Sequence, residues 1–226
     1  MKIRYCLLGS IPALAGILLM IFVALDTFIL EGSFLNGTNG KYEVAQDLMM
    51  SEEDLEKATY AMVDYVEGKI SDAQVSVMVN GQETEFFTEK ELVHLVDVRN
   101  LISKFKVFRN ICIIIFFAGT ILILWKRKIR EFCVGFWIAW GILLIAAFAV
   151  GAMAFMDIDL VINGFHKIFF NNDLWILSFN QHRSLWMFQD EMYVDFLGYI
   201  AGIMMTILGI TMIGTMGAYK FGASKE

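Results

Sequence analysis

Four long apolar segments limit what this chain can fold into. They are Tyr5–Leu30, Val107–Trp125, Phe132–Met156 and Val194–Gly217. A helix needs about 20 mainly apolar residues to cross the hydrocarbon core of a bilayer, and each segment is close to or above that length. With 58% hydrophobic residues, the 226-residue chain is also too apolar for an ordinary soluble domain. We therefore expect an all-α membrane protein with four transmembrane helices.

The basic residues predict how these four helices are oriented. Four of the five residues in Lys126–Arg130 are basic, and short loops rich in Lys and Arg stay in the cytoplasm. We accordingly place the turn 126–131, the N-terminus and the tail 218–226 in the cytoplasm. The first apolar segment is too long for a typical signal peptide, so we expect an uncleaved membrane helix. Both polar segments, 31–104 and 157–193, then lie on the extracytoplasmic side.

The first polar segment, 31–104, is predicted to be a small α+β insert between spans 1 and 2. It carries more than twice as many acidic as basic residues, and its Asn-Gly-Thr-Asn-Gly stretch at 36–40 is expected to be flexible. A helix over Glu52–Glu67 should be followed by a β-hairpin that turns at Asn80-Gly81. The capping box Thr88-Glu-Lys-Glu91 should open a second helix. The net charge of −6 does not favour a nucleic-acid partner.

Two histidines are the most chemically active groups outside the apolar segments. His94 lies in the stretch Glu91-Leu-Val-His-Leu-Val-Asp-Val-Arg99, and His166 lies in the second polar segment, which we expect to be a loop, between Asn163 and Trp175. An imidazole exchanges a proton near neutral pH. In the predicted topology, both histidines lie on the extracytoplasmic side. Asp97 follows His94 by three positions, so it shares a helix face with His94 and is available to fix its tautomer.

No covalent nucleophile is evident in the chain. The sequence has no Gly-x-Ser-x-Gly elbow, and the three cysteines, Cys6, Cys112 and Cys133, lie within or beside apolar segments. Chemistry in which the substrate supplies its own nucleophile fits better, with the protein contributing proximity and proton transfer. The remaining histidine, His182, is expected to be an ordinary surface residue, and Trp175 is expected to be an interface anchor.

Two stretches resemble the signature sequences of a bacterial family of integral membrane proteins. They are Phe165-His-Lys-Ile-Phe-Phe-Asn-Asn-Asp-Leu-Trp175 and Glu91–Arg99. The family is that of the lipoprotein intramolecular transacylase, Lit, and it has four spans with an outer insert between the first two. The resemblance implies that an acyl chain moves from the sn-2 ester oxygen of a diacylglyceryl-modified lipoprotein to the α-amino group of its N-terminal cysteine. It also implies lyso-form lipoprotein as the product, lipoproteins and membrane lipids as partners, and no cofactor or metal ion.

The same resemblance maps the two histidines of the family onto His94 and His166. We expect His166 to take the proton that the α-amine must lose and to return it to the departing alkoxide. We expect His94 to orient His166 or to polarise the ester carbonyl, although the two roles could be exchanged. The expected supporting residues are Asp97, Arg99, Asn171 and Asp173. The last two belong either to a turn that closes the loop or to a site for the polar end of the substrate.

Two other classes of function remain open on the sequence. In the first, His94, His166 and Asp97 bind zinc, since three protein ligands suffice for a catalytic site. No His-Glu-x-x-His-like pair supports this alternative. In the second, the protein is a membrane sensor without enzymatic activity, and it binds a partner through its acidic insert. Replacement of both histidines would leave the function of such a sensor unchanged.

Overall fold

The computed structural model describes residues 3–29 and 32–223, which divide into two compact units. We call the first the apolar unit; it falls within residues 1–24, 106–156 and 197–226. We call the second the polar unit; it falls within residues 25–105 and 157–196. The polar unit therefore combines two segments that are separated in the sequence by more than fifty residues.

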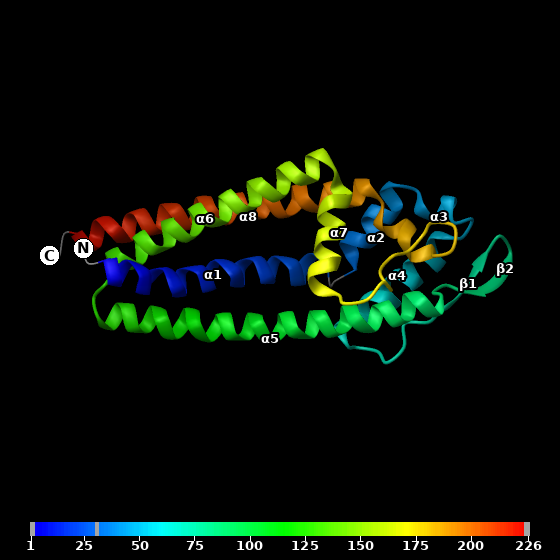
Figure 1. The fold of residues 1–226 in the computed structure, drawn as a ribbon, viewed down its shortest axis with the longest axis horizontal. Helices are drawn as coiled ribbons and strands as arrows, with labels where there is room; N and C mark the ends of the chain where they lie inside the picture. The colour runs from blue at the N-terminus through cyan, green and yellow to red at the C-terminus, as the bar shows by residue number, and fades with distance from the viewer. Residues whose placement is uncertain (1–2, 30–31, 224–226) are drawn as a thin grey trace. The chain divides into compact units, whose positions relative to one another are not determined.

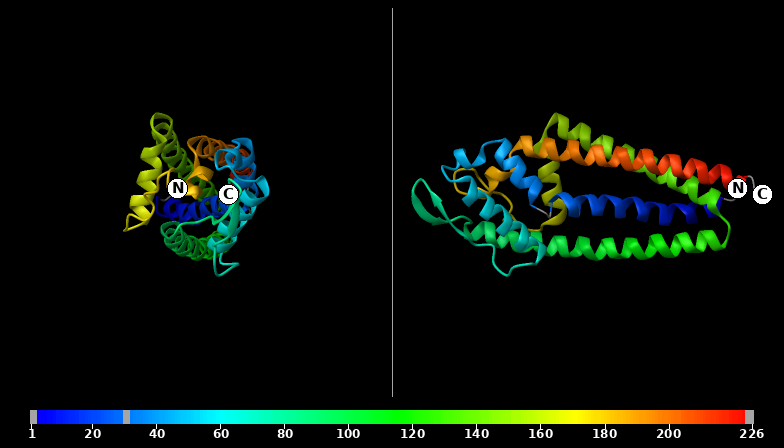
Figure 2. Two further views of the ribbon diagram at one scale, coloured as in Figure 1. Left: turned by 90° about the vertical axis from the view of Figure 1, so that its right-hand side faces the viewer. Right: turned by 180° about the vertical axis from the view of Figure 1, so that it is seen from behind.

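The described elements follow one another in the order shown in Figure 1, and Figure 2 gives two further views. They are α1 (Ile3–Ile29), α2 (Ser33–Lys41), α3 (Val44–Asp47), α4 (Glu52–Glu67), β1 (Ser76–Val79), β2 (Gln82–Glu85), α5 (Glu89–Trp125), α6 (Ile129–Met156), α7 (Ile158–Phe169), the 3-10 helix η1 (Arg183–Phe188) and α8 (Asp190–Ala223).

Among the described residues, three helices are long and apolar enough to cross a membrane, as judged by length and composition. They are Glu89–Trp125, Ile129–Met156 and Asp190–Lys220, and they contain the second, third and fourth predicted spans. In α1, which runs from Ile3 to Ile29, the stretch Gly9–Val23 is apolar. The structure thus confirms a mainly helical chain with three candidate spans. The four-span topology stays a prediction at this point.

Close packing of α1 in the apolar unit depends on glycine. A Cβ atom at Gly135 of α6 would lie 2.5 Å from the backbone nitrogen of Ser10 in α1. A Cβ atom at Gly119 of α5 would lie 2.5 Å from the Cβ of Pro12. Small residues are a common means by which membrane helices bring their backbones together. The proline of α1 is therefore accommodated by a glycine on the neighbouring helix.

The basic turn between α5 and α6 is shorter than the predicted turn 126–131. Helix α6 already begins at Ile129, so the turn itself comprises residues 126–128. Arg127 adopts a left-handed conformation with φ of 52°. Lys128 forms an ion pair with Glu131, three residues later, at 3.2 Å. This pair spans the junction of turn and helix, which accounts for the earlier start of α6.

The polar unit contains the predicted helix and hairpin. Helix α4 begins where the Ser51 hydroxyl accepts a hydrogen bond from the Asp54 amide at 3.1 Å, and it ends at Gly68, whose φ is 85°. Strands β1 and β2 pair antiparallel around Asn80 and Gly81, and both turn residues have positive φ. The core between helix and hairpin includes Leu55, Val77 and Phe86, each at most 1% exposed.

Helix α2 occupies the stretch 36–40 that the sequence predicts to be flexible, so that prediction is wrong. Asn39 is 1% exposed, and its amide nitrogen donates a hydrogen bond to the hydroxyl of Thr59 in α4 at 3.0 Å. Leu35, on the same helix, joins the core of the polar unit. Burial against α4 therefore overrides the low helix propensity of glycine and asparagine.

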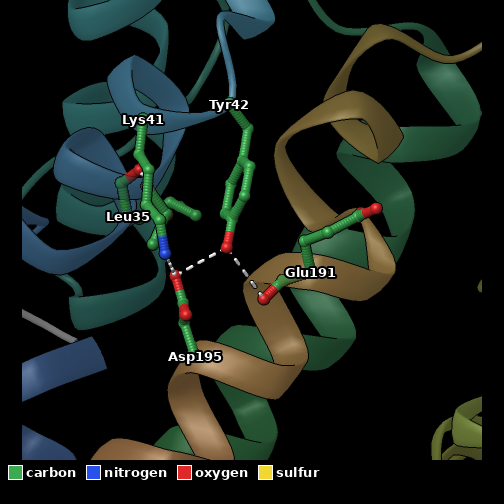
Figure 3. A network of polar contacts seen from close by, with 6 residues as sticks. Leu35, Lys41, Tyr42, Glu191 and Asp195 are labelled. Carbon is green, nitrogen blue, oxygen red and sulfur yellow. Dashed lines mark hydrogen bonds and ion pairs between the residues drawn. The ribbon is translucent and has the colours of Figure 1, made fainter.

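A polar network joins the end of α2 to the first turns of α8 within the polar unit (Figure 3). The Lys41 ammonium lies 2.5 Å from a carboxylate oxygen of Asp195. The Tyr42 hydroxyl donates a hydrogen bond to the same oxygen at 2.8 Å. These contacts fix residues 190–196 of α8 against the insert, although they are 149 to 154 positions apart in the sequence.

The second polar segment, 157–193, is not the loop that the sequence predicts. Its first part is helix α7, which begins at the N-cap Asp157, whose side chain accepts a hydrogen bond from the Asp159 amide at 3.0 Å. The apolar residues of this helix recur at helical spacing, a signal that the aromatic clusters in the same stretch obscured. His166 is consequently held by a helix rather than by a loop.

Candidate active site

The first histidine is positioned by the capping box at the start of α5. The Glu91 side chain accepts hydrogen bonds from the amide of Thr88 at 2.6 Å and from its hydroxyl at 2.7 Å, as the sequence predicts. Its other carboxylate oxygen accepts hydrogen bonds from the amide and hydroxyl of Ser184 at 2.9 and 2.6 Å. His94 follows in the next turn of α5, well before the apolar part of that helix begins at Val107.

The second histidine lies near the end of α7, and its hydrogen bond fixes its tautomer. The Nδ1 atom of His166 is 2.8 Å from the carbonyl oxygen of Ile162, one turn earlier. A carbonyl oxygen only accepts hydrogen bonds, so we assign the proton to Nδ1. In the neutral ring, Nε2 then carries the free lone pair. His166 therefore presents a ring nitrogen that can take up a proton.

The fold brings the two histidines together. Their ring centroids are 5.9 Å apart, although 72 positions separate them in the sequence. Phe170 contacts both rings, at centroid distances of 5.1 Å from His94 and 5.6 Å from His166. Trp175 stacks on His166, with centroids 4.8 Å apart and an angle of 21° between the planes. The sequence predicts Trp175 as an interface anchor, whereas in the structure it covers one face of an imidazole.

The apolar surroundings keep both imidazoles neutral. The pKa of His94 is lowered from 6.5 to about 4, chiefly by burial; the nearby His166 and Lys90 act in the same direction, whereas Asp97 opposes the shift. Burial also lowers the pKa of His166, and the hydrogen bond to the Ile162 carbonyl opposes that change. At neutral pH, each ring is therefore uncharged and can accept or donate a proton.

His94 has an unused polar atom in this pair. Its Nδ1 atom is buried and has no hydrogen-bond partner within the part of the chain that the structure describes. A buried ring nitrogen without a partner costs free energy, which a substrate's polar group would recover on binding. Unsatisfied groups of this kind in native proteins are often functional. The two rings thus differ, because His166 is held by its Nδ1 atom while the same atom of His94 is open.

Asp97 is engaged by a residue that the sequence prediction left out of the site. The amide nitrogen of Asn172 donates a hydrogen bond to a carboxylate oxygen of Asp97 at 2.9 Å. The amide oxygen of Asn172 accepts a hydrogen bond from the backbone of Leu174 at 3.1 Å. At the other end of the same segment, the Lys90 ammonium donates to the Ile176 carbonyl at 2.5 Å. These hydrogen bonds hold residues 172–176 against α5 at one position before His94 and one position after it in the sequence.

The spacing of residues in α5 could have indicated that Lys90 and Asp97 both contribute to the site. Lys90, His94 and Asp97 are four and three positions apart, so they lie on one face of the helix. The predicted face includes His94 and Asp97 but omits Lys90. Asn172 lies between Asn171 and Asp173, two of the expected supporting residues, but nothing in the sequence distinguishes it from these neighbours. Only the fold identifies it as the partner of Asp97.

The other expected supporting residues are described by contacts elsewhere in the polar unit or by their exposure. Arg99 donates a hydrogen bond to the Ile70 carbonyl at 3.3 Å, and its guanidinium lies 5.0 Å from the centre of the Tyr65 ring. Asn171 and Asp173 are exposed, and the backbone carbonyl of Asp173 accepts a hydrogen bond from the Ile176 amide at 3.2 Å. Arg99 thus contacts the end of α4, and Asp173 helps to form the turn that follows α7.

The prediction that His182 is an ordinary surface residue is wrong. The residue is only 6% exposed. Its Nδ1 atom accepts a hydrogen bond from the Ser178 amide at 3.1 Å, and its backbone amide donates to the Ser178 carbonyl at 3.0 Å. The side chain closes a turn before η1, which explains its burial.

A metal site receives no support from the geometry. In residues 3–29 and 32–223, no group of three or more His, Cys, Asp or Glu side chains is placed to hold a metal ion. Asp97, the third ligand in the zinc alternative, accepts a hydrogen bond from Asn172 instead. Two neutral imidazoles, one of which presents a free Nε2 lone pair, can instead exchange a proton with a bound group.

The family model for the lipoprotein intramolecular transacylase Lit matches residues 11–193, which include both histidines. The chain belongs to the Lit family. This result confirms the resemblance found in the two histidine stretches. It also confirms the expectation of a membrane acyltransferase.

Solved structures of Lit from Bacillus cereus, described as a membrane-integral protein, resemble the chain throughout its length. One has a TM-score of 0.72 at 18% sequence identity, and the match covers 98% of this chain and 95% of that one. A Lit variant with a histidine replaced by arginine has a TM-score of 0.68 at 19% identity, with 98% and 93% coverage. The corresponding alanine variant gives 0.67 at 16% identity, with 98% and 91% coverage. These likenesses establish the Lit fold; no curated protein matches the chain.

Proposed function

We propose that this Lit family member moves the sn-2 acyl chain of a diacylglyceryl-modified lipoprotein to the α-amino group of its N-terminal cysteine. The product is a lyso-form lipoprotein with a free hydroxyl on the glyceryl group. The observation that carries this proposal is the pair of neutral imidazoles, His94 and His166, whose ring centroids are 5.9 Å apart. Family membership supplies the reaction class, and the geometry supports a role for each ring.

The substrate provides both reacting groups, so no protein nucleophile is required. The α-amine has a pKa near 8, so part of it is neutral at pH 7. Its nitrogen attacks the carbonyl carbon of the sn-2 ester and forms a tetrahedral intermediate. The nitrogen then loses a proton, the bond between the carbonyl carbon and the glyceryl oxygen breaks, and that oxygen gains a proton. No water is consumed, and the acyl group remains on the same molecule.

His166 is assigned the proton transfer. Its Nδ1 atom is held by the Ile162 carbonyl, so its Nε2 atom is available as a base. We propose that Nε2 takes the proton from the attacking nitrogen and returns it to the departing glyceryl oxygen. A pKa below the usual value for histidine keeps this base neutral before the reaction. It also makes the imidazolium that forms a strong acid toward the leaving alkoxide.

His94 is assigned the electrophilic role. Its ring is neutral, and its buried Nδ1 atom has no partner among the described residues. We propose that an N–H of this ring donates a hydrogen bond to the ester carbonyl, where negative charge develops in the transition state. Asp97 acts on this ring through its charge, while its hydrogen bond goes to Asn172.

We further propose that α1 is a fourth transmembrane helix and that the histidine pair faces the extracytoplasmic side. Two observations support this topology. The basic turn at 126–128 favours a cytoplasmic location, and each of α5 and α6 is long enough to cross from one side to the other. The polar unit would then lie on the extracytoplasmic side, where the lipid-modified N-termini of exported lipoproteins reside under this proposal.

Mass spectrometry of lipoprotein N-termini tests the proposed function. The chain is expressed in a bacterium whose lipoproteins carry a free α-amine, beside the variants His94→Ala and His166→Ala. The wild type should shift one acyl group to the amine without any change in total mass, and both variants should fail to do so. Lys167→Ala is the matched control, because Lys167 is exposed and adjacent to His166 in sequence. Unchanged lipoproteins with the wild type in the membrane, or full activity of both variants, would contradict the proposal.

A further inference from the structure

Helix α7 has an apolar face that no other part of the described structure buries. None of its twelve residues is buried, although most of them are apolar. The large side chains on this face are substantially exposed: Leu160 at 58%, Phe165 at 42%, Ile168 at 76% and Phe169 at 41%. An exposed apolar surface of this kind usually marks a contact with a partner or a membrane.

The polar residues of α7 lie together on the other side of the helix. At 100° per residue, Asp159, Asn163, His166 and Lys167 fall within one continuous sector. The apolar residues fill the remainder, so the helix is strongly amphipathic. Amphipathic helices with this pattern lie in the interface plane and bury their apolar face about 5–10 Å into the boundary between headgroups and acyl chains.

The chain itself keeps the start of α7 close to a membrane-crossing helix. Helix α6 ends at Met156 and α7 begins at Ile158, so only Asp157 separates them. Two trans peptide units span at most about 7.6 Å between Cα atoms. The last residues of α6, Phe155 and Met156, are 93% and 81% exposed and apolar. An exposed apolar helix end is therefore followed in the chain, after one residue, by the amphipathic helix α7.

We infer that α7 is an interfacial helix whose apolar face lies on the acyl chains of the outer leaflet. His166 is located at the border of the two faces, next to Ile162, to whose carbonyl it is hydrogen-bonded. This border corresponds to the layer in which the ester groups of lipids lie. The helix thus holds the base at the depth of the ester that it acts on, and the substrate reaches it without leaving the bilayer. The choice of the outer leaflet, the role of His166 as a base and the identity of that ester rest on the proposed function.

Spin labels on opposite faces of α7 test this inference without any substrate. The protein is reconstituted in vesicles of phosphatidylethanolamine and phosphatidylglycerol after replacement of Cys6, Cys112 and Cys133 by serine. One label is attached at Ile168→Cys on the apolar face, and a matched label is attached at Asn163→Cys on the polar face. Both positions are exposed, so the labels should not disturb the fold. Collisions with oxygen, which concentrates in lipid, are compared with collisions with a water-soluble nickel complex.

The ratio of oxygen to nickel accessibility should be several-fold higher at Ile168→Cys than at Asn163→Cys. If the labels at both positions are equally accessible, and more accessible to the nickel complex than to oxygen, the inference is overturned, since the helix would then lie in water. Low accessibility of Ile168→Cys to both reagents would also overturn it, because a protein surface, such as a second copy of the chain, would cover the face. None of these outcomes depends on acyl transfer, so a failure of the proposed function remains distinguishable.

Discussion

At the scale of single residues, the function of the site depends on keeping two adjacent imidazoles uncharged. A histidine in water is about half protonated near its pKa of 6.5, and two cationic rings with centroids 5.9 Å apart would repel each other. Burial and the aromatic neighbours Phe170 and Trp175 remove the charged form of each ring. A hydrogen bond reduces the cost of burying the polar ring of His166, whereas none to a described residue does so at the Nδ1 atom of His94.

Titration of His94 and His166 by NMR should reveal this difference. The Cε1–H resonance of His94 should titrate near pH 4 and that of His166 below 6.5, with single His→Gln variants providing the assignments. Because Asp97 favours the charged form of His94, Asp97→Asn should lower the His94 midpoint further. A His94 midpoint at or above 6.5 would mean that the ring is not desolvated, and the account of its neutrality would be wrong.

The same pKa shifts predict how stability depends on pH. The folded-state pKa of His94 lies below its unfolded value of about 6.5, so the unfolded state binds more protons in the range between the two. The contribution of His94 to stability is fully present above pH 6.5 and is lost as the pH falls toward 4. The thermal midpoint in detergent should therefore decrease across this range. It should decrease less in His94→Gln; an equal decrease in both proteins would assign the effect to other groups.

The contact between Asp97 and Asn172 can be tested by exchanging its two partners. Asn172→Leu and Asn172→Asp each break the contact, and a hydrogen bond to a charged group contributes about 1.5–3 kcal/mol. Because Asp97 is partly exposed, we expect a loss in kcat of roughly tenfold rather than more. The double variant Asp97→Asn with Asn172→Asp can rebuild the hydrogen bond in the opposite direction and should recover most of the rate. If the double variant recovers none of the lost kcat, the charge of Asp97 acts through His94 and not through the positioning of residues 172–176.

At the scale of elements, the start of α5 is the part that the sequence describes most completely. The capping box predicts both the first residue of the helix and the role of Glu91, because these signals are local. The second function of Glu91, its pair of hydrogen bonds to Ser184, could not be predicted, because the partner is 93 positions away. The same carboxylate therefore both starts the helix that carries His94 and holds η1 against it.

Loss of Glu91 should accordingly destabilise the polar unit. Glu91 is 2% exposed, and Glu91→Ala would leave the amide and hydroxyl of Ser184 without their acceptor. We expect a loss of about 3 kcal/mol, which corresponds to roughly 6–12 °C in the unfolding midpoint for a chain of this size. Glu89→Ala is the control, since Glu89 is exposed in the same helical turn and its replacement should change little. Equal effects of the two substitutions would contradict the role of the buried carboxylate.

Helix α7 shows why a helical element could be missed. Its sequence contains a strong amphipathic pattern, but the aromatic residues and the Asn-Asn-Asp cluster behind it favoured a loop interpretation. In α2 the opposite occurred, since glycine and asparagine predicted flexibility, while Leu35 and Asn39 are buried against other parts of the unit. In both cases the decisive interaction was not local: for α2 it was tertiary burial, and for α7 we propose contact with lipid.

At the scale of the whole molecule, hydropathy and two short stretches predicted the class of protein, the fold and the reaction class. The three candidate membrane spans are evident from the sequence because apolar length is a property of the sequence itself. The histidine pair could be proposed but not demonstrated, because no local signal specifies a distance between residues 72 positions apart. The positions of Arg99, Asn172 and His182 depend on how the insert and the second polar segment fold within the polar unit. They were therefore accessible only from the structure.

The central claim is that the histidine pair transfers an acyl group within one substrate molecule, with the amine as nucleophile. A crossover measurement tests it most directly. Two synthetic diacylglyceryl lipopeptides of different peptide mass are mixed with the purified protein, and only one carries a deuterated sn-2 chain. Mass spectrometry should find the deuterated chain on the amine of its own peptide alone, with total masses unchanged and with no product from His166→Ala. Deuterium on the other peptide, or loss of the chain by hydrolysis, would contradict the account.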